Sequence, residues 1–203
     1  MTIVDLNGAD PRLAQFHAGI YWDAFAAQHE PLDAWRRAIA TGLLSVRLAV
    51  DGAEILGGIC FERYPKSGVG FATYLVVAPA ARGQGLGERL LRGAVDELGG
   101  LVLGEVNDPR RTGEWARLER FQRWGARVLD ARYVQPSLGP GLARDRGLVL
   151  VAFAGKDPLP AEIDGARVRA FVEELYALTE GGAVDADVAI TDRVRLVTLE
   201  RAT

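Results

Sequence analysis

The sequence predicts an α/β protein, with a mixed, mostly antiparallel sheet of about six to seven strands, flanking helices and a C-terminal helix-strand extension. Three observations lead to this prediction. Apolar residues recur at helical spacing before residue 43, three apolar runs joined by turn signals fill residues 43–77, and apolar runs alternate with helical segments from residue 101 onward. At 203 residues, 49% hydrophobic and 25% charged, the chain is sized for one domain with a modest extension.

Two helices are expected before the first long strand. Asp10-Pro11 supplies an N-cap acceptor followed by the residue best tolerated at the first helical position. A second helix is expected from about residue 31, and Gly42 ends it. The apolar positions that define the two helices are Leu13, Phe16 and Ile20 in the first and Leu32, Trp35 and Ile39 in the second.

Three strands are expected next, over residues 43–50, 55–64 and 69–77. Asp51-Gly52 separates the first two strands, and Pro65-Lys66-Ser67-Gly68 separates the second from the third. An Asp-Gly pair or a Pro-x-x-Gly segment between two apolar runs is typical of a hairpin. The three strands should therefore be antiparallel neighbours.

A glycine-rich loop follows the third strand and opens an amphipathic helix that ends near Leu98. The loop reads Arg82-Gly83-Gln84-Gly85-Leu86-Gly87. The first amides of a helix have no intrahelical partner and carry a partial positive charge, so they can bind an anion. Glycines remove the Cβ atoms that would hold a phosphate away from these amides, and Arg82 adds a positive charge. The pattern predicts a phosphate site.

The spacing of the glycines decides among three kinds of phosphate loop. It lacks the six-residue glycine span of the dinucleotide fingerprint, and no Gly-Lys-Ser/Thr follows as in a P-loop. The whole string resembles the acyl-CoA-binding signature of the GNAT superfamily of N-acetyltransferases, with Arg/Gln-x-x-Gly-x-Gly/Ala at its core: Leu75-x-Val77-x-Pro79-x-x-Arg82-Gly83-x-Gly85-x-Gly87.

This resemblance implies that acetyl-CoA is the cofactor. The loop amides would hold the CoA pyrophosphate, and backbone groups near Val76 and Val77 would pair with the pantetheine arm. The residues expected to bind the cofactor are Leu75, Val76, Val77, Arg82, Gly83, Gln84, Gly85, Leu86 and Gly87.

The order of the remaining elements also resembles the GNAT fold, in which the sheet splays beside its fourth strand. A strand is expected at 101–106, a helix at 112–124, and strands at 127–134 and 147–153. The resemblance covers roughly residues 5–155, so we expect a GNAT domain at 1–155. Residues 156–203 form a helix-strand extension that should pack on the same domain, as an additional edge or as a contact in a homodimer.

Acetyl transfer to an amine needs a base, because an alkyl ammonium has a pKa of about 10.4. Glu105 is the preferred candidate, since its strand ends where the sheet of GNAT proteins splays and its apolar neighbours should raise its pKa. Asn107 and Asp108 could orient water or the acceptor. An ion pair between Glu105 and an arginine is the competing interpretation. The other candidate bases are Glu62, His17 and His29.

The residue at the usual general-acid position departs from the family pattern. GNAT proteins usually carry a tyrosine in a string like Leu-Tyr-x-x-x-Gly-Phe, and here Phe121 occupies the tyrosine position, while Glu114 stands where asparagine is common. A phenyl ring cannot donate a proton. Either the thiolate leaves unassisted, or Tyr133 or Tyr74 acts instead, or the protein is a non-catalytic acyl-CoA-binding or regulatory module.

Composition limits the partners. A formal charge of −3 provides no general basic field for nucleic acid, and the lone Cys60 excludes a disulfide framework and a cysteine metal cluster. The N-terminus does not resemble a signal peptide, and the uncharged run at 67–81 is too short to cross a membrane. We expect a soluble, cytoplasmic, bacterial enzyme, with acyl-CoA and an amine acceptor as partners, no nucleic acid, no membrane and no metal. The acceptor and the acyl chain length stay open.

Overall fold

In the computed structural model, which describes residues 1–25, 30–139 and 141–201, the chain forms two units. Unit 1 consists of Met1–Arg63 and Phe71–Leu98. Unit 2 consists of Tyr64–Gly70 and Gly99–Thr203. The segment 64–70 is the turn that was predicted between the second and third strands of the 43–77 region. Both units are discontinuous in sequence as a result.

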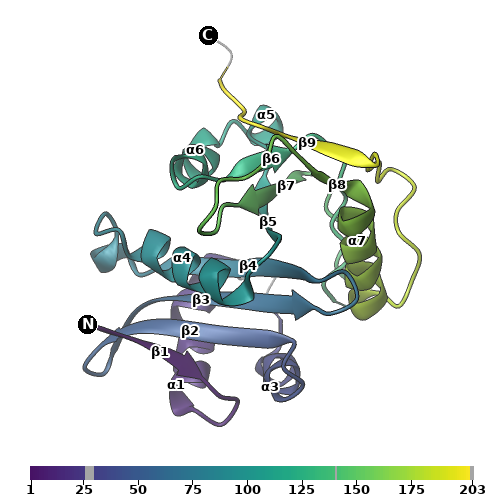
Figure 1. The fold of residues 1–203 in the computed structure, drawn as a ribbon. Coiled ribbons are helices and arrows are strands. Elements are labelled where there is room, and N and C mark those ends of the chain that lie inside the picture. Colours follow the sequence, from purple (N-terminus) through teal and green to yellow (C-terminus); the bar gives the residue numbers. More distant parts are fainter. Residues whose placement is uncertain (26–29, 140, 202–203) are drawn as a thin grey trace. The chain divides into compact units, whose positions relative to one another are not determined.

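Unit 1 has a four-stranded arrangement in the order β1-β2-β3-β4 (Figure 1). β1 (Thr2–Leu6) pairs antiparallel with β2 (Leu44–Asp51), which pairs antiparallel with β3 (Glu54–Tyr64); β4 spans Val69–Val77. The three strands predicted at 43–77 are confirmed to within one residue at each end. β1 was not predicted, because its five residues are too few for a clear alternation and it is largely exposed.

The helices of unit 1 are α1 (Pro11–Phe16), the π-helical η1 (His17–Tyr21), α2 (Trp22–Phe25), α3 (Leu32–Ala40), the 3-10 turn η2 (Pro79–Ala81) and α4 (Leu86–Leu98). Asp10 caps α1 as predicted, since its carboxylate accepts from the Arg12 amide at 2.9 Å. Leu13, Phe16, Tyr21 and Trp35 are almost fully buried and form one apolar cluster. The two predicted leading helices are therefore present: the first, which was defined by apolar positions up to Ile20, spans α1 and η1, and α2 is additional.

Unit 2 has five strands in the order β5-β7-β6-β9-β8 (Figure 1). They span Val102–Asn107, Leu148–Phe153, Arg127–Leu129, Arg193–Val197 and Glu162–Asp164 respectively, and each neighbouring pair is antiparallel. The helices are α5 (Pro109–Thr112), α6 (Trp115–Arg123) and α7 (Gly165–Thr179). With β1 and β8 added, the described residues form nine strands instead of the six to seven expected.

Two predicted elements of unit 2 differ from the structure. The helix predicted from about residue 112 to 124 is α6, and it begins three residues later than predicted, because Gly113 adopts a left-handed backbone with φ 74° and separates α6 from the short α5. The strand predicted at 127–134 ends at Leu129, and only Arg132 and Gln135 make isolated bridges beyond it. The apolar pattern continues past 129 because Tyr133 and Val134 are buried in a segment without regular structure.

Residues 156–203 contribute directly to unit 2. β9 pairs with β6, so contacts within the unit join both sides of residue 155. Glu174 of α7 accepts hydrogen bonds from the amides of Lys66 and Ser67, at 3.2 and 3.1 Å, and so caps the 64–70 turn. The predicted domain boundary at 155 stays a prediction.

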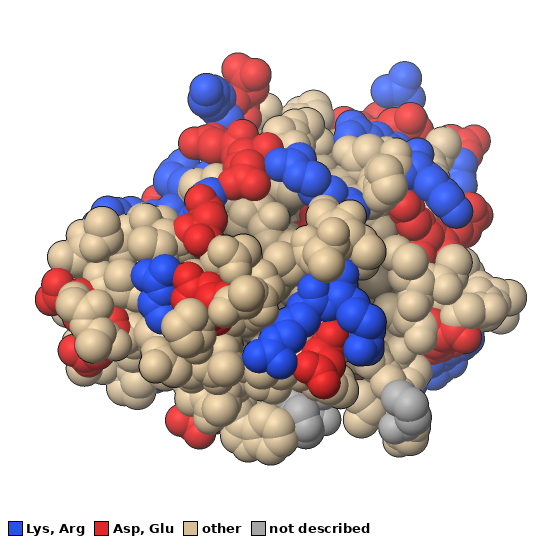
Figure 2. All heavy atoms as spheres, turned by 90° about the horizontal axis from the view of Figure 1, so that it is seen from below, with Lys and Arg blue, Asp and Glu red and all other residues tan. Residues whose placement is uncertain are grey.

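The molecular surface carries charges of both signs. Lysine and arginine side chains are interspersed with acidic ones over the face drawn in Figure 2, in keeping with the formal charge of −3. Within the described ranges, no helix has both the length and the apolar character needed to span a membrane.

Candidate active site

The glycine loop of unit 1 lies between η2 and α4. Gly83 and Gly85 have φ of +79° and +73°, a conformation that other residues rarely adopt. No heavy atom lies within 4 Å of a Cβ placed on either glycine, and both residues are exposed. The predicted loop is therefore open in front of its backbone amides, while Gly87 lies in the first turn of the helix.

Hydrogen bonds fix the shape of this loop. The Arg89 amide donates to the Gly85 carbonyl at 3.1 Å, which closes the first turn of α4 and leaves the preceding amides at the open end of the helix. Arg82 Nε donates to the Val77 carbonyl at 3.1 Å, and Gln84 Nε2 donates to the Ala80 carbonyl at 3.4 Å. Arg82 therefore ties the loop to the end of β4, a role that the sequence did not indicate.

The segment expected to pair with pantetheine depends on a close approach between two strands. Val76 is buried, and Leu75 and Val77 are partly buried. A Cβ at Gly57 of β3 would lie only 2.8 Å from the Val76 carbonyl oxygen, so a side chain there would displace β4. Gly57 is thus a residue that supports this segment and that sequence reasoning missed.

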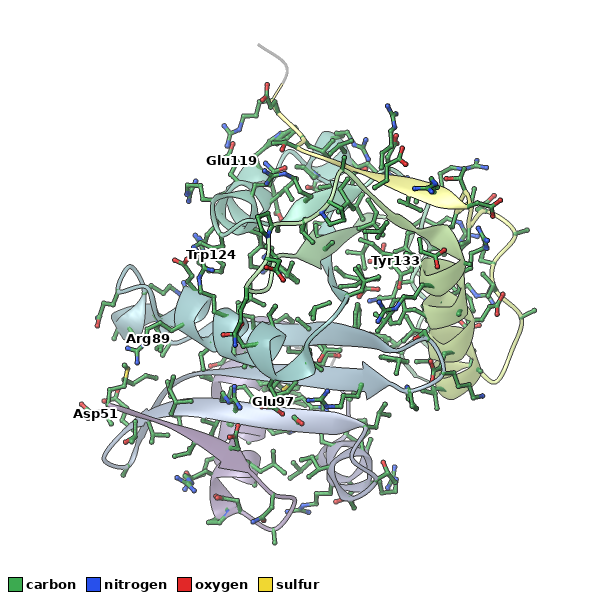
Figure 3. All side chains as sticks on the ribbon, in the orientation of Figure 1. Asp51, Arg89, Glu97, Glu119, Trp124 and Tyr133 are labelled. Carbon is green, nitrogen blue, oxygen red and sulfur yellow. The ribbon has the colours of Figure 1, made fainter. Side chains whose placement is uncertain are left out.

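A separate candidate site is a hydrogen-bonded cluster in unit 2, centred on Glu105 of β5. Tyr133 donates its hydroxyl proton to Glu105 Oε1, and Gln135 Nε2 donates to Glu105 Oε2 at 2.6 Å. Tyr133, labelled in Figure 3, is 6% exposed and Gln135 is 7% exposed. The structure brings together the two predicted catalytic residues and adds Gln135.

Burial dominates the electrostatics of this cluster. It raises the pKa of Glu105 to about 7; the hydrogen bonds from Tyr133 and Gln135 oppose this rise, and the negative charge of Asp145 adds to it. Burial, followed by the charge of Glu105, raises the pKa of Tyr133 well above 10. At neutral pH Tyr133 keeps its proton, whereas Glu105 can exchange one.

The residues next to Glu105 have other partners. Asp108 caps α5 and also binds the guanidinium of Arg110 at 2.8 and 2.9 Å, and Asn107 Nδ2 donates to Glu114 Oε2 at 3.4 Å. Burial acts to raise the pKa of Asp108, but the bonds from Arg110 outweigh it and lower the pKa overall. Asp108 is therefore held in a local ion pair.

Phe121, at the position where the family usually has tyrosine, packs in an aromatic group. Its ring meets Phe153 edge-on at 5.5 Å and lies 5.5 Å from Trp124, a residue labelled in Figure 3. Its contacts are those of a core side chain.

The remaining candidates belong to unit 1. His17 is 7% exposed, and its Nε2 lies 2.7 Å from the Glu30 carbonyl oxygen. The Tyr74 hydroxyl donates to Glu30 Oε2 over 3.5 Å. Glu62 is partly buried on β3, and His29 lies outside the described residues. His17 and Tyr74 thus contact the same residue, Glu30.

Two further residues of interest were missed by sequence reasoning. Glu30 accepts a hydrogen bond from Trp35 Nε1 at 3.1 Å, and burial raises the pKa of its carboxyl group. Nothing local in the sequence distinguishes it from a surface glutamate. Gln135 did carry a weak signal, because residues two apart in an extended segment lie on the same side, which it shares with Tyr133.

A family model covers the region that holds the loop and Glu105. Residues 14–109 match the model of the acetyltransferase (GNAT) family. This matched segment is slightly less than half of the 203-residue chain. It contains the glycine loop and Glu105, whereas Tyr133 and Gln135 lie beyond it. No curated protein sequence matches the chain.

Solved GNAT structures have the same fold. A protein from Bacteroides thetaiotaomicron described as a GNAT-family acetyltransferase has 18% identity and a TM-score of 0.72, over 90% of this chain and 100% of that one. An acetyltransferase from Salmonella typhimurium, solved with acetyl-CoA, has 19% identity and a TM-score of 0.55 over 79% and 96% of the two chains. An aminoglycoside 6'-N-acetyltransferase solved with coenzyme A has 17% identity and a TM-score of 0.56 over 79% and 99%. The predicted fold class is confirmed.

Proposed function

We propose that the protein is an acetyl-CoA-dependent N-acetyltransferase that moves an acetyl group from CoA to a primary amine of a small molecule or protein. The observation that carries the proposal is the open glycine loop at the start of α4, which lies inside the segment that matches the GNAT family model. Two proteins of the same fold, solved with acetyl-CoA and with CoA, support the choice of cofactor.

The loop would bind the cofactor mainly through its backbone. The amides at the open end of α4 suit the pyrophosphate, because they carry a partial positive charge and no Cβ screens them at Gly83 or Gly85. Backbone groups of Val76 and Val77 would pair with the pantetheine arm. Arg82 would add charge near the phosphates while it keeps its bond to the Val77 carbonyl.

Glu105 would act as general base, directly or through water. Its carboxylate takes a proton from the ammonium, and the neutral amine then attacks the thioester carbonyl carbon. The C–N bond forms, the attacking nitrogen releases its second proton to water, the C–S bond breaks, and CoA leaves as a thiolate that takes up a proton. A carboxyl group with a pKa of about 7 suits this role, because near neutral pH much of it is deprotonated and the carboxylate is still basic enough to take a proton.

Tyr133 is the proposed acid for the departing thiolate. Its raised pKa keeps the hydroxyl protonated at neutral pH, so a proton is available to donate. Its hydrogen bond to Glu105 offers a route by which the proton taken from the amine replaces the one donated. Glu105 and Tyr133 would then act as one proton-transfer pair.

A non-catalytic acyl-CoA-binding module is the second candidate. Phe121 favours it, since that position supplies the usual acid of the family and its ring is here engaged with Phe153 and Trp124. Such a module would bind acetyl-CoA without releasing CoA.

A thiol-release assay distinguishes the two functions. The protein is incubated with acetyl-CoA and, in turn, a polyamine, an aminoglycoside and a peptide with a free N-terminus, while calorimetry measures acetyl-CoA binding. We expect amine-dependent release of CoA and a product heavier by one acetyl group. If the protein binds acetyl-CoA but releases no CoA with all three kinds of amine, the result would support the non-catalytic module instead.

A further inference from the structure

The helix of the C-terminal extension, α7, holds the segment that carries both donors to Glu105. The Tyr176 hydroxyl donates to the Val134 carbonyl at 2.9 Å, and Tyr176 itself is fully buried. Val134 lies between Tyr133 and Gln135, the two residues that donate to the carboxylate. A single hydrogen bond from α7 therefore fixes the peptide unit between the two donors.

An ion-pair network makes a second connection at the end of α7. The Arg144 guanidinium lies over the Tyr176 ring, 5.0 Å from its centroid, and binds Glu180 at 2.6 Å and Asp185 at 3.0 Å. Glu180 also accepts from the Ser137 amide at 2.5 Å. The side chains of Glu180 and Asp185 are 16% and 8% exposed, so water screens these contacts less than it would at the surface.

The segment that contains Arg144 is joined to Gln135 by backbone hydrogen bonds. The backbones of Gln135 and Asp145 exchange two hydrogen bonds, at 2.8 and 3.1 Å. Asp145 directly follows Arg144, so the ion-pair network holds the strand-like stretch that is paired with Gln135. We call Tyr176, Arg144, Glu180 and Asp185 the α7 clamp.

We propose that the α7 clamp is a positioning device that keeps Tyr133 and Gln135 on Glu105 and thereby sets how tightly this carboxylate binds a proton. The link to catalysis rests on the proposed function. Among the described residues, no hydrogen bond or ion pair joins a clamp residue to Glu105, so the clamp would act through the two donors. The C-terminal extension would thus be part of the machinery that prepares the base.

The direction of the effect follows from the groups that face Glu105. Tyr133 and Gln135 stabilise its charged form, and the charge of Asp145 destabilises it. The partner opposite Glu105 in the β5–β7 ladder is the apolar Leu150. The two hydrogen bonds affect the pKa more than Asp145 does, so loosening the clamp should raise the pKa of Glu105 further.

The test removes one hydroxyl group. Tyr176→Phe removes the bond to Val134 and keeps the ring under Arg144. In protein labelled with carboxyl-¹³C glutamate, with the Glu105 signal assigned by its loss in Glu105→Gln, we expect the Glu105 titration midpoint to rise by roughly 0.5–1 pH unit. The acidic limb of kcat/KM should move by the same amount, with little change in kcat at high pH.

Four further variants test this result from both sides. Tyr133→Phe removes a donor directly and should give a shift of about one unit or more. Arg144→Gln should resemble Tyr176→Phe, and Arg144→Lys should give a smaller shift because it keeps the charge that binds Glu180 and Asp185. Glu119→Gln is the matched control, since it breaks an exposed ion pair with Arg201 in the same unit and should leave the titration unchanged.

The outcomes separate this proposal from the proposed function. An unchanged Glu105 midpoint in folded Tyr176→Phe and Arg144→Gln, with only a lower Tm, would overturn the proposal and leave the clamp a stabilising contact. A shifted midpoint without a shift in the kcat/KM limb would support the clamp and remove Glu105 as the base. If Tyr176→Phe does not fold, Arg144→Gln decides, because Arg144 lies nearer the surface.

Discussion

The glycine loop of unit 1 and the Glu105 cluster of unit 2 are built in opposite ways. The loop is exposed, consists of six consecutive residues and offers backbone amides. The cluster is buried, joins side chains from residues 105, 133 and 135, and offers one carboxyl group whose pKa its surroundings have raised. A site made of backbone depends on local conformation, whereas a tuned carboxylate depends on distant parts of the chain.

The largest effect should come from removing the base. Glu105→Gln keeps the shape of the cluster and one acceptor oxygen, loses the acceptor for one of the two donors, and cannot act as a base, so kcat/KM should fall by roughly two to four decades. Steady-state kinetics measures this fall, and acetyl-CoA affinity by calorimetry should be nearly unchanged. The acidic limb near pH 7 should vanish as well, since the carboxylate that forms above its pKa of about 7 would be gone.

A folded Glu105→Gln variant that keeps its rate and its acidic limb would contradict this assignment. The base would then be Glu62, His17, His29 or bulk water. The Glu105 cluster would then have no catalytic role.

The corresponding change in the loop should abolish cofactor binding. Gly85→Glu places a carboxylate where the pyrophosphate must approach the amides and forces a side chain into a backbone with φ +73°, so CoA affinity should fall about 100-fold or more. Isothermal titration calorimetry measures the loss. Gly85→Gln separates charge from strain, and should weaken binding less.

Gly52→Glu is the matched control for the loop. Gly52 has φ +57° and open space around it in the same unit, so this variant carries a similar strain and the same added charge in the β2–β3 turn. It should bind CoA as the wild type does. Equal losses in both variants would mean that general destabilisation, and not the anion site, explains the result.

The buried carboxylate should also appear in the stability of the fold. The pKa of Glu105 is raised from 4.5 to about 7 in the folded chain, so its contribution is fully present below pH 4.5 and is lost as pH rises through 7. The loss amounts to about 3 kcal/mol. Urea unfolding at pH 5 and pH 8 should show Glu105→Gln gaining stability relative to the wild type by roughly this amount. A difference that does not change with pH would show that Glu105 is charged at both values.

The smallest effect should come from Arg82. Arg82→Ala removes an exposed charge near the proposed phosphate site, so CoA affinity should fall several-fold at low salt and less at high salt. Arg37→Ala, which removes an exposed arginine from α3, serves as the control. A loss independent of ionic strength would indicate that the bond from Arg82 to the Val77 carbonyl is what matters.

The contrast between the two regions also explains what the sequence could predict. The loop was predictable because its glycines, Arg82 and the helix that follows are consecutive, and their chemistry is local. The start of the helix predicted from about residue 112 was missed because Gly113 has a left-handed conformation that ends α5 inside a helical pattern. β1 and β8 were missed because strands of five and three residues with exposed positions have little pattern.

The Glu105 cluster was only half predictable. Glu105 was chosen from its strand and Tyr133 as a replacement for the missing tyrosine, but no pattern placed them in contact. The contact of Gln135 with Glu105 and the α7 clamp could not be predicted, because such contacts join residues far apart in sequence, as Tyr133 and Glu105 are, 28 positions apart. Such contacts follow from tertiary packing and from the hydrogen-bonding needs of buried groups.

The cap on the 64–70 turn has a consequence for the order in which the chain can fold. Glu174 accepts from the amides of Lys66 and Ser67, so the bonds span 108 and 107 positions. A chain emerging from the ribosome has completed the β3–β4 turn long before residue 174 is synthesised. The two amides therefore lack their Glu174 acceptor until more than a hundred further residues have been added, and this cap forms only when a long loop closes.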